Sequence, residues 1–227
     1  MDRRIIDFHT HAFPDALAGR AMAHLCAETD AVTAYLDGRL SSLAASMDAA
    51  GIETSVLCSI ATKPSQFEPI FEWSRSIASD RIVPLASVHP HDPDLAGRVR
   101  QVAAAGLAGI KMHPYYQDFD IDDAALDPLY GALEETGLLL TLHTGFDFAF
   151  AWVDRAGPGK ISAVLAKFPD LRLVTTHLGG WQQWEAVEAL LIGRPIYMET
   201  SFSVQYLPEA QLRRMLARAA VEAGASA

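Results

Sequence analysis

Short apolar runs alternate along the chain with longer segments of helical spacing. The runs predict strands at 4–8, 54–60, 81–88, 107–112, 138–142, 171–176 and 195–198. Helical segments follow them at 40–51, 65–79, 92–106, 121–137, 159–168, 181–191 and 208–223. Strands that are apolar throughout suit a parallel sheet covered on both faces, and this alternation is typical of βαβ units. Seven such units in one chain favour a (β/α) barrel over a doubly wound sheet, and glycine-rich phosphate loops are absent.

Length sets an expectation about the completeness of the barrel. A TIM-type barrel has eight βα units and about 250 residues. This chain has 227 residues and stops after the seventh predicted helix. We therefore expect a single α/β domain over residues 1–227, a TIM-type barrel that lacks the eighth βα unit and is C-terminally incomplete.

Charge and composition narrow the classes of function. The sequence holds 18 basic and 28 acidic residues, a net charge of −10, which argues against nucleic-acid and anionic-membrane partners. No apolar stretch approaches the roughly 18 residues of a membrane helix, and the N-terminus does not resemble a secretory signal. The two cysteines show no CxxC spacing, so both are expected as reduced thiols in or near the core. The expected location is the cytoplasm.

Histidines are the most informative residues. The eight histidines include two His-x-His pairs, where random placement would give fewer than one. Six of them follow predicted strands: His9, His11, His89, His113, His143 and His177. Barrel enzymes build their active sites at the C-terminal ends of the strands, so we expect these imidazoles to converge. His91, beside His89, is expected to cap the following helix.

The spacing of the first pair predicts a metal site. Asp7, His9 and His11 alternate, so on a strand they would face one side. With a third imidazole from another strand they could hold a divalent cation and leave a position for water, whose pKa would fall toward about 7. His143 ends an apolar strand, where a metal would satisfy its ring. His177 would be a further ligand or a general acid/base. Core, capping or loop hydrogen-bonding roles remain the alternatives.

Further residues are candidates for substrate contact. Lys111 and His113 follow the fourth predicted strand, and Lys111 would bind a substrate carboxylate, bridge two metals if carbamylated, or form a salt bridge inside the barrel. Glu199 ends the seventh strand as a substrate contact, a partner of a metal ligand, or a structural hydrogen-bond acceptor. Phe146 and Trp152 bound an aromatic loop that predicts an apolar wall over the site, or otherwise a satellite core or dimer contact.

Four motifs together resemble the amidohydrolase superfamily. They are Asp7-Phe8-His9-Thr10-His11, Gly109-Ile110-Lys111-Met112-His113-Pro114, Leu142-His143-Thr144-Gly145 and Thr176-His177-Leu178-Gly179-Gly180. The closest branch is amidohydrolase-2, which includes the aminocarboxymuconate-semialdehyde-decarboxylase-like enzymes. The resemblance implies a (β/α)8 barrel with one divalent metal ion, commonly zinc, held by His9, His11 and His143, with His177 as the catalytic histidine. The family pattern also has an aspartate on strand eight, for which this sequence offers no matching motif.

These observations leave three expectations about function. The first is a metal-dependent hydrolase, in which metal-activated water attacks an ester, lactone or amide of a small organic substrate. The second is a metal-dependent decarboxylase or hydratase acting on an aromatic or unsaturated acid. The third is an inactive, truncated barrel. The expected partners are a small-molecule substrate and, because the branch often dimerises, a second copy of the chain.

Overall fold

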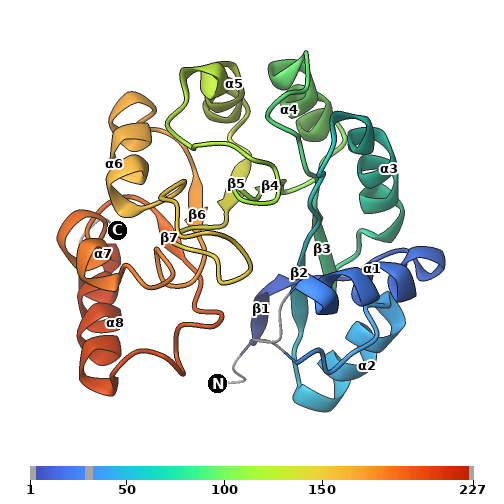
Figure 1. Ribbon diagram of the computed structural model, residues 1–227, viewed down its shortest axis with the longest axis horizontal. Coiled ribbons are helices and arrows are strands. Elements are labelled where there is room, and N and C mark those ends of the chain that lie inside the picture. Colours follow the sequence, from blue (N-terminus) through green and yellow to red (C-terminus); the bar gives the residue numbers. More distant parts are fainter. Residues whose placement is uncertain (1–3, 29–32, 225–227) are drawn as a thin grey trace.

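The computed structural model describes residues 4–28 and 33–224. Strands line its centre and helices cover the outside (Figure 1). The strands are β1 (Ile6–Thr10), β2 (Thr54–Cys58), β3 (Ile82–Leu85), β4 (Gly109–Met112), β5 (Leu139–Leu142), β6 (Leu173–Thr175) and β7 (Tyr197–Met198). They pair in parallel as β1-β2-β3 and β4-β5-β6-β7. One parallel bridge between Ala86 and Ile110 joins the two sheets, so the described strands form the wall of a TIM-type barrel, as predicted.

Helices connect successive strands, and the last helix follows β7. They are α1 (Asp15–Glu28), α2 (Leu40–Ala50), α3 (Phe67–Ile77), α4 (Leu95–Ala104), α5 (Asp127–Thr136), α6 (Pro158–Lys167), α7 (Trp184–Leu190) and α8 (Glu209–Gly224). Short 3-10 turns, Pro64–Gln66 and Ala124–Leu126, precede α3 and α5. None of the described helices combines the length and the apolar composition needed to cross a membrane.

Three sequence-based expectations were wrong in detail. The first strand lies two residues later than predicted, so His9 is inside β1 and not beyond it. Helix α4 begins at Leu95 and is capped by Asp94, whose carboxylate accepts a hydrogen bond from Gly97 N at 3.0 Å, so His91 is not the cap. Cys26 is exposed, because the helix that carries it turns that residue toward solvent.

A seam separates the first and last strands of the wall. Among the described residues, β1 and β7 share no ladder hydrogen bonds. Between them lies a cavity of about 660 Å³, which is lined from β1 by Ile6, Asp7 and Phe8 and from the β7 side by Tyr197 and Glu199 among others. The seam stands where a closed barrel would place another strand, so the described wall has seven strands.

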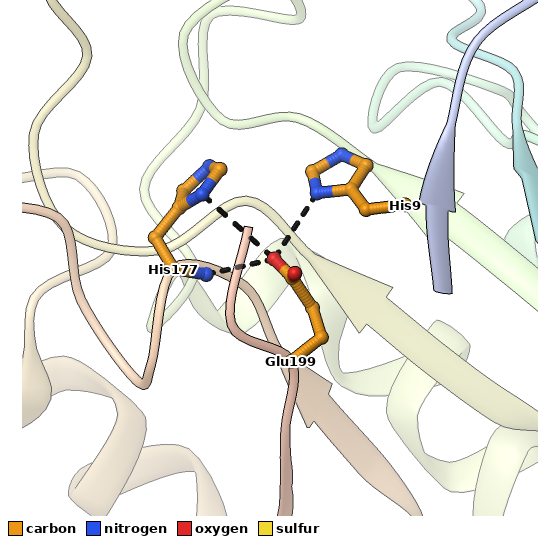
Figure 2. Close-up of side chains that lie close together, drawn as sticks. All are labelled: His9, His177 and Glu199. Atoms are coloured by element: carbon orange, nitrogen blue, oxygen red, sulfur yellow. Dashed lines mark hydrogen bonds and ion pairs between the residues drawn. The ribbon is translucent and has the colours of Figure 1, made fainter. Parts of the chain in front are cut away.

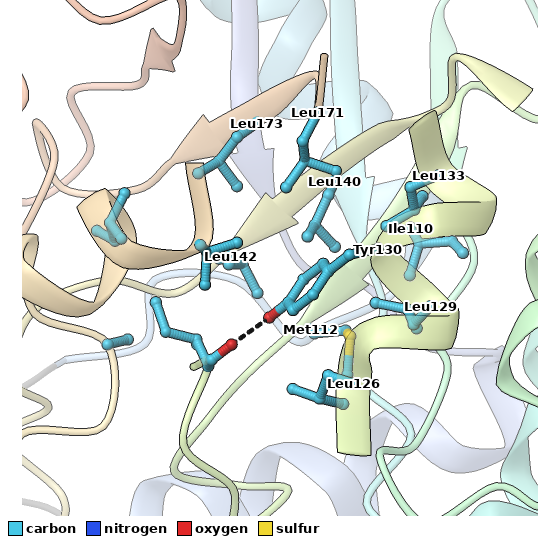
Figure 3. Close-up of a cluster of buried hydrophobic side chains, with 14 of the residues drawn as sticks. Ile110, Met112, Leu126, Leu129, Tyr130, Leu133, Leu140, Leu142, Leu171 and Leu173 are labelled. Atoms are coloured by element: carbon cyan, nitrogen blue, oxygen red, sulfur yellow. Dashed lines mark hydrogen bonds between the residues drawn. The ribbon is translucent and has the colours of Figure 1, made fainter. Parts of the chain in front are cut away.

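The main core lies between β4–β6 and the helices that cover them (Figure 3). Ile110 and Met112 of β4 are fully buried against Tyr130 and its leucine neighbours. The Tyr130 hydroxyl donates a 2.6 Å hydrogen bond to Ile121 O, which satisfies its one polar atom in this apolar setting. Because side chains alternate along a strand, the intervening Lys111 points to the opposite face, into the barrel, where it is also fully buried.

Candidate metal centre

Five imidazoles form a continuous row at the C-terminal ends of the strands. The ring centroids of His11 and His9 lie 5.1 Å apart, and those of His9 and His177 lie 5.4 Å apart. His177 is followed by His143 at 4.8 Å and His143 by His113 at 4.1 Å. The structure therefore brings together five of the six histidines that were expected to converge, from strands β1, β4, β5 and β6 or the residues after them. His89 is not part of the row: its ring lies 5.3 Å from that of His91, and its Nδ1 accepts a hydrogen bond from His91 N at 3.1 Å.

The two histidines of the first pair each direct Nδ1 at an oxygen. His9 Nδ1 lies 3.1 Å from Glu199 Oε1, and His11 Nδ1 lies 2.7 Å from the Cys58 carbonyl oxygen. Carboxylate and carbonyl oxygens only accept hydrogen bonds, so each ring carries its proton on Nδ1. The Nε2 atoms of His9 and His11 are therefore left with their lone pairs, the form in which imidazole binds metal.

His143 and His177 meet through their rings. His143 Nε2 donates to Phe146 O at 3.2 Å, and His177 Nδ1 lies 3.1 Å from both Ser201 O and Ser201 Oγ. His143 Nδ1 keeps its lone pair and lies 3.2 Å from His177 Nε2. Two groups of side chains offer ligand atoms within 4.8 Å of one another: His9, His177 and Glu199 in one, and His113, His143 and Asp147 in the other. These donor sets fit a divalent metal ion, for which neutral imidazole is a common ligand.

Glu199 holds His177 in a strained backbone conformation (Figure 2). His177 and Leu178 have φ angles of 56° and 53°, which non-glycine residues rarely adopt. Glu199 Oε1 accepts a hydrogen bond from His177 N at 2.8 Å, and Glu199 O accepts one from Leu178 N at 2.7 Å. Glu199 Oε1 also accepts the hydrogen bond from His9 Nδ1, so Glu199 positions both histidines.

The histidines of the row are neutral at pH 7. Burial, followed by repulsion from Lys111, lowers the pKa of His9, although Glu199 acts in the opposite direction. His11 keeps an open surface, yet desolvation by the surrounding protein and the charge of Lys111 lower its pKa to about 4. Burial raises the pKa of Glu199, but the hydrogen bonds from His9 and from Ser201 N are among the interactions that outweigh burial and bring the pKa to about 2. The His9–Glu199 contact is thus a hydrogen bond from a neutral ring to a carboxylate.

Lys111 is a buried cation without a carboxylate partner in the described chain. Its Nζ lies 3.4 Å from His9 Nε2, and no ion pair joins it to an acid among residues 4–28 and 33–224. Burial lowers its pKa, while Cys58 and Glu199 act to raise it. The alternative of a salt bridge inside the barrel is therefore not observed.

Asp147 is a residue of the site that sequence reasoning missed. Its Oδ2 lies 3.4 Å from His113 Nε2 and 3.6 Å from His143 Nε2, and all three side chains are buried. Asp147 lies within the aromatic loop, whose Phe146 and Phe148 on either side of it favour apolar packing over metal binding. The spacing of four residues from His143 was the available signal.

The sequence model of one protein family, described as amidohydrolase, matches residues 6–226. The chain belongs to the amidohydrolase family. This confirms the resemblance seen in the motifs and, at that level, a metal-dependent kind of enzyme. No protein with a curated description matches the chain.

Solved structures resemble this amidohydrolase over nearly its full length. An uncharacterised TIM-barrel protein of Bordetella bronchiseptica has a TM-score of 0.72 at 21% identity, over 95% of this chain and 81% of that one. A 5-carboxyvanillate decarboxylase of Novosphingobium aromaticivorans with bound manganese has 0.67 at 15%, over 96% and 84%. A probable 2-pyrone-4,6-dicarboxylic acid hydrolase of Acinetobacter baumannii has 0.61 at 13%, over 95% and 77%. At these identities the likeness establishes the shared fold.

The aromatic loop forms a rim beside the candidate metal centre of the amidohydrolase. Phe146 and Trp152 stack with ring centroids 4.7 Å apart. Phe146 also packs on the main core, whereas Trp152 is 63% exposed. Across the rim, Phe148 lies 6.0 Å from Phe202. The loop therefore joins the core on one side and presents apolar rings to solvent on the other.

Proposed function

We propose that the protein is a metal-dependent hydrolase that cleaves an ester, lactone or amide bond in a small carboxylated substrate. The observation that carries the proposal is the row of neutral imidazoles, in which His143 Nδ1 and His177 Nε2 lie 3.2 Å apart. The His9 ring lies 5.4 Å from the His177 ring, and His9 and His11 keep their lone pairs on Nε2. This arrangement supports a divalent metal centre of the kind that activates water.

The residues divide between holding the ion and moving protons. His9, His11 and His143 would hold one divalent ion, proposed as zinc. When bound, such an ion lowers the pKa of water and polarises a carbonyl oxygen. His177 is neutral at pH 7 because burial lowers its pKa, so its Nε2 can take a proton from the attacking water and return it to the leaving group. In this role the other proton of the ring would lie on Nδ1, where Ser201 O, 3.1 Å away, can accept a hydrogen bond from it.

Lys111 supports a carboxylate on the substrate. A buried ammonium without an acidic partner is unfavourable, and an incoming carboxylate would complete the pair. The aromatic rim of Phe146 and Trp152 suits a flat apolar body attached to that carboxylate. The probable pyrone dicarboxylic acid hydrolase among the similar structures is named for a substrate of this chemistry.

Decarboxylation is the second candidate. The same Lys111 and aromatic rim would bind a carboxylated aromatic ring, and a carboxyvanillate decarboxylase shares the fold. The two reactions differ in their products, because decarboxylation releases carbon dioxide and hydrolysis of an ester or lactone releases an acid and no gas.

A product assay with matched variants tests the proposal. Wild type, His11→Ala and His177→Asn would be loaded with zinc or manganese and offered carboxylated lactones, aryl esters and hydroxybenzoates. Acid release and carbon dioxide release would be followed separately, and metal content measured by elemental mass spectrometry. We expect acid release by wild type, loss of metal and activity in His11→Ala, and retained metal with at least 100-fold lower activity in His177→Asn.

The control is His91→Ala, an exposed histidine of the other His-x-His pair, which should resemble wild type. Carbon dioxide without hydrolysis would select the second candidate. Full metal content and activity in His11→Ala would overturn both.

A further inference from the structure

A second group of side chains that could hold a metal ion adjoins the first. His113, His143 and Asp147 offer ligand atoms that all lie within 4.8 Å of one another, and each residue is buried. The group belongs to the C-terminal end of β4 and β5 and to the loop after β5. The centre proposed above uses only His143 of these three, and it uses the other side of the ring.

The distances in this group fit a metal site better than hydrogen bonds. Asp147 Oδ2 is 3.4 Å from His113 Nε2 and 3.6 Å from His143 Nε2. Both exceed the usual length of a charge-assisted hydrogen bond, about 2.7–2.9 Å. Ligands at about 2.0–2.2 Å from a tetrahedral zinc ion are separated by roughly 3.3–3.6 Å. His143 Nε2 also donates a hydrogen bond to Phe146 O at 3.2 Å, which coordination of a metal through Nε2 would replace.

We propose that His113 Nε2, His143 Nε2 and Asp147 Oδ2 bind a second divalent cation. Two imidazoles and a carboxylate form a donor set suited to zinc, cobalt or manganese. When His113 coordinates through Nε2, its proton lies on Nδ1. The only hydrogen bond that Nδ1 then loses is the long one that it accepts from Tyr116 N at 3.5 Å.

Occupancy of this second site changes His143. A neutral imidazole has one lone pair, so His143 can bind through Nδ1 toward the first centre or through Nε2 toward the second, but not both. When Nε2 binds the second cation, the proton moves to Nδ1. There it lies 3.2 Å from His177 Nε2 and donates a hydrogen bond to it. The second cation therefore withdraws one ligand from the first centre and occupies the lone pair of His177.

The expected consequence is inhibition by excess metal, a step that rests on the proposed function. The first equivalent supports turnover through His9, His11 and His143. The second equivalent leaves the first ion with only His9 and His11 of its histidine ligands, because the lone pair of His177 is then occupied. Activity should therefore rise with the first equivalent of metal and fall with the second.

Metal stoichiometry tests the second site without reference to activity. Tag-free, metal-stripped protein would be titrated with cobalt(II) by equilibrium dialysis, and the visible absorption of the bound ion recorded. Wild type should bind two equivalents. Asp147→Asn and His113→Gln should each keep the first and weaken the second at least 10-fold, whereas His11→Ala should keep the second.

The matched control is Asp118→Asn, whose side chain is 82% exposed on the same side of the barrel. It should bind two equivalents like wild type. A thermal melt would establish that each variant is folded, and His113→Gln decides the question if Asp147→Asn does not fold. One equivalent in wild type, or two equivalents with unchanged affinity in both ligand variants, would overturn the second site. Loss of the first equivalent in His11→Ala is read separately, so failure of the proposed function is distinguishable.

Discussion

Replacing Glu199 tests whether one carboxylate organises both the site and the fold around it. Its Oε1 accepts hydrogen bonds from His177 N at 2.8 Å, His9 Nδ1 at 3.1 Å and Ser201 Oγ at 2.9 Å. Its Oε2 accepts one from Ser201 N at 2.6 Å. Glu199→Ala removes every one of these acceptors and leaves two backbone N–H groups without their partner.

Two estimates of the effect agree in size. A carboxyl group whose pKa is about 2 in place of 4.5 contributes about 3 kcal/mol at neutral pH. A buried donor that loses its acceptor is destabilising by about 1–3 kcal/mol. We therefore expect Glu199→Ala to lose about 3 kcal/mol of unfolding free energy. Glu199→Gln, which keeps one acceptor oxygen, should lose about 1–2 kcal/mol.

Urea unfolding at pH 7, with cobalt(II) affinity measured in parallel, provides the assay. Affinity should fall by about 10–100-fold in Glu199→Ala because His9 loses the acceptor that orients it. The carboxylate contributes its stability above the ordinary pKa of 4.5, and this contribution disappears as the pH falls from about 4.5 to about 2. The difference between wild type and Glu199→Gln should therefore shrink over that interval. A variant within 0.5 kcal/mol of wild type, with unchanged metal affinity, would refute the reasoning.

Three further perturbations follow from the structure. Burial lowers the pKa of the clustered histidines, that of His11 to about 4, so the metal-free protein should lose unfolding free energy as the pH falls below about 6.5. The loss should reach up to about 1.4 kcal/mol per pH unit for each histidine. Unfolding free energies from urea titrations that stay constant from pH 7.5 to 5 would contradict this. Lys111→Met removes a buried charge that has no acidic partner in the described chain, so the unfolding free energy of the variant should lie between that of wild type and about 1 kcal/mol above it. KM for carboxylated substrates should rise at least 10-fold, and an unchanged KM would count against a carboxylate contact. Gly145→Ala should lose about 2–4 kcal/mol of unfolding free energy in urea, because Gly145 has a φ of 81° and a Cβ there would lie 2.0 Å from Trp181 N. Gly159→Ala, where a Cβ meets nothing within 4 Å, is the control and should lose none. Equal stabilities of the two variants would reject the steric argument.

The order of strands was predictable because buried parallel strands are apolar on both faces. That pattern located β4, β5 and β6 closely, and their covering helices with them. Helix α1 was not predicted. Between residues 15 and 27 only Ala18 is fully buried, and Leu17 is 43% exposed. The segment therefore has no apolar stripe that would indicate a helix. Strand β1 was displaced because its C-terminal half is polar and carries the site.

The site was predictable in membership more than in geometry. The positions of His143 and His177 after apolar strands indicated that they would meet, and they do. The orientation of each ring is set by the carbonyl oxygens of Cys58, Phe146 and Ser201, and a backbone carbonyl has no signature in the sequence because every residue has one. Asp147 was missed for a related reason, since its role depends on the path of a loop.

The contact between His9 and Glu199 joins residues 190 positions apart. Closing so long a loop carries a large entropic penalty, and contacts of this range form late in folding. During synthesis the N-terminal histidines leave the ribosome long before the carboxylate that orients them. The candidate metal centre can therefore assume its final geometry only after synthesis has reached Glu199, and earlier loading of His9 and His11 by free metal would involve a site still without its organising residue.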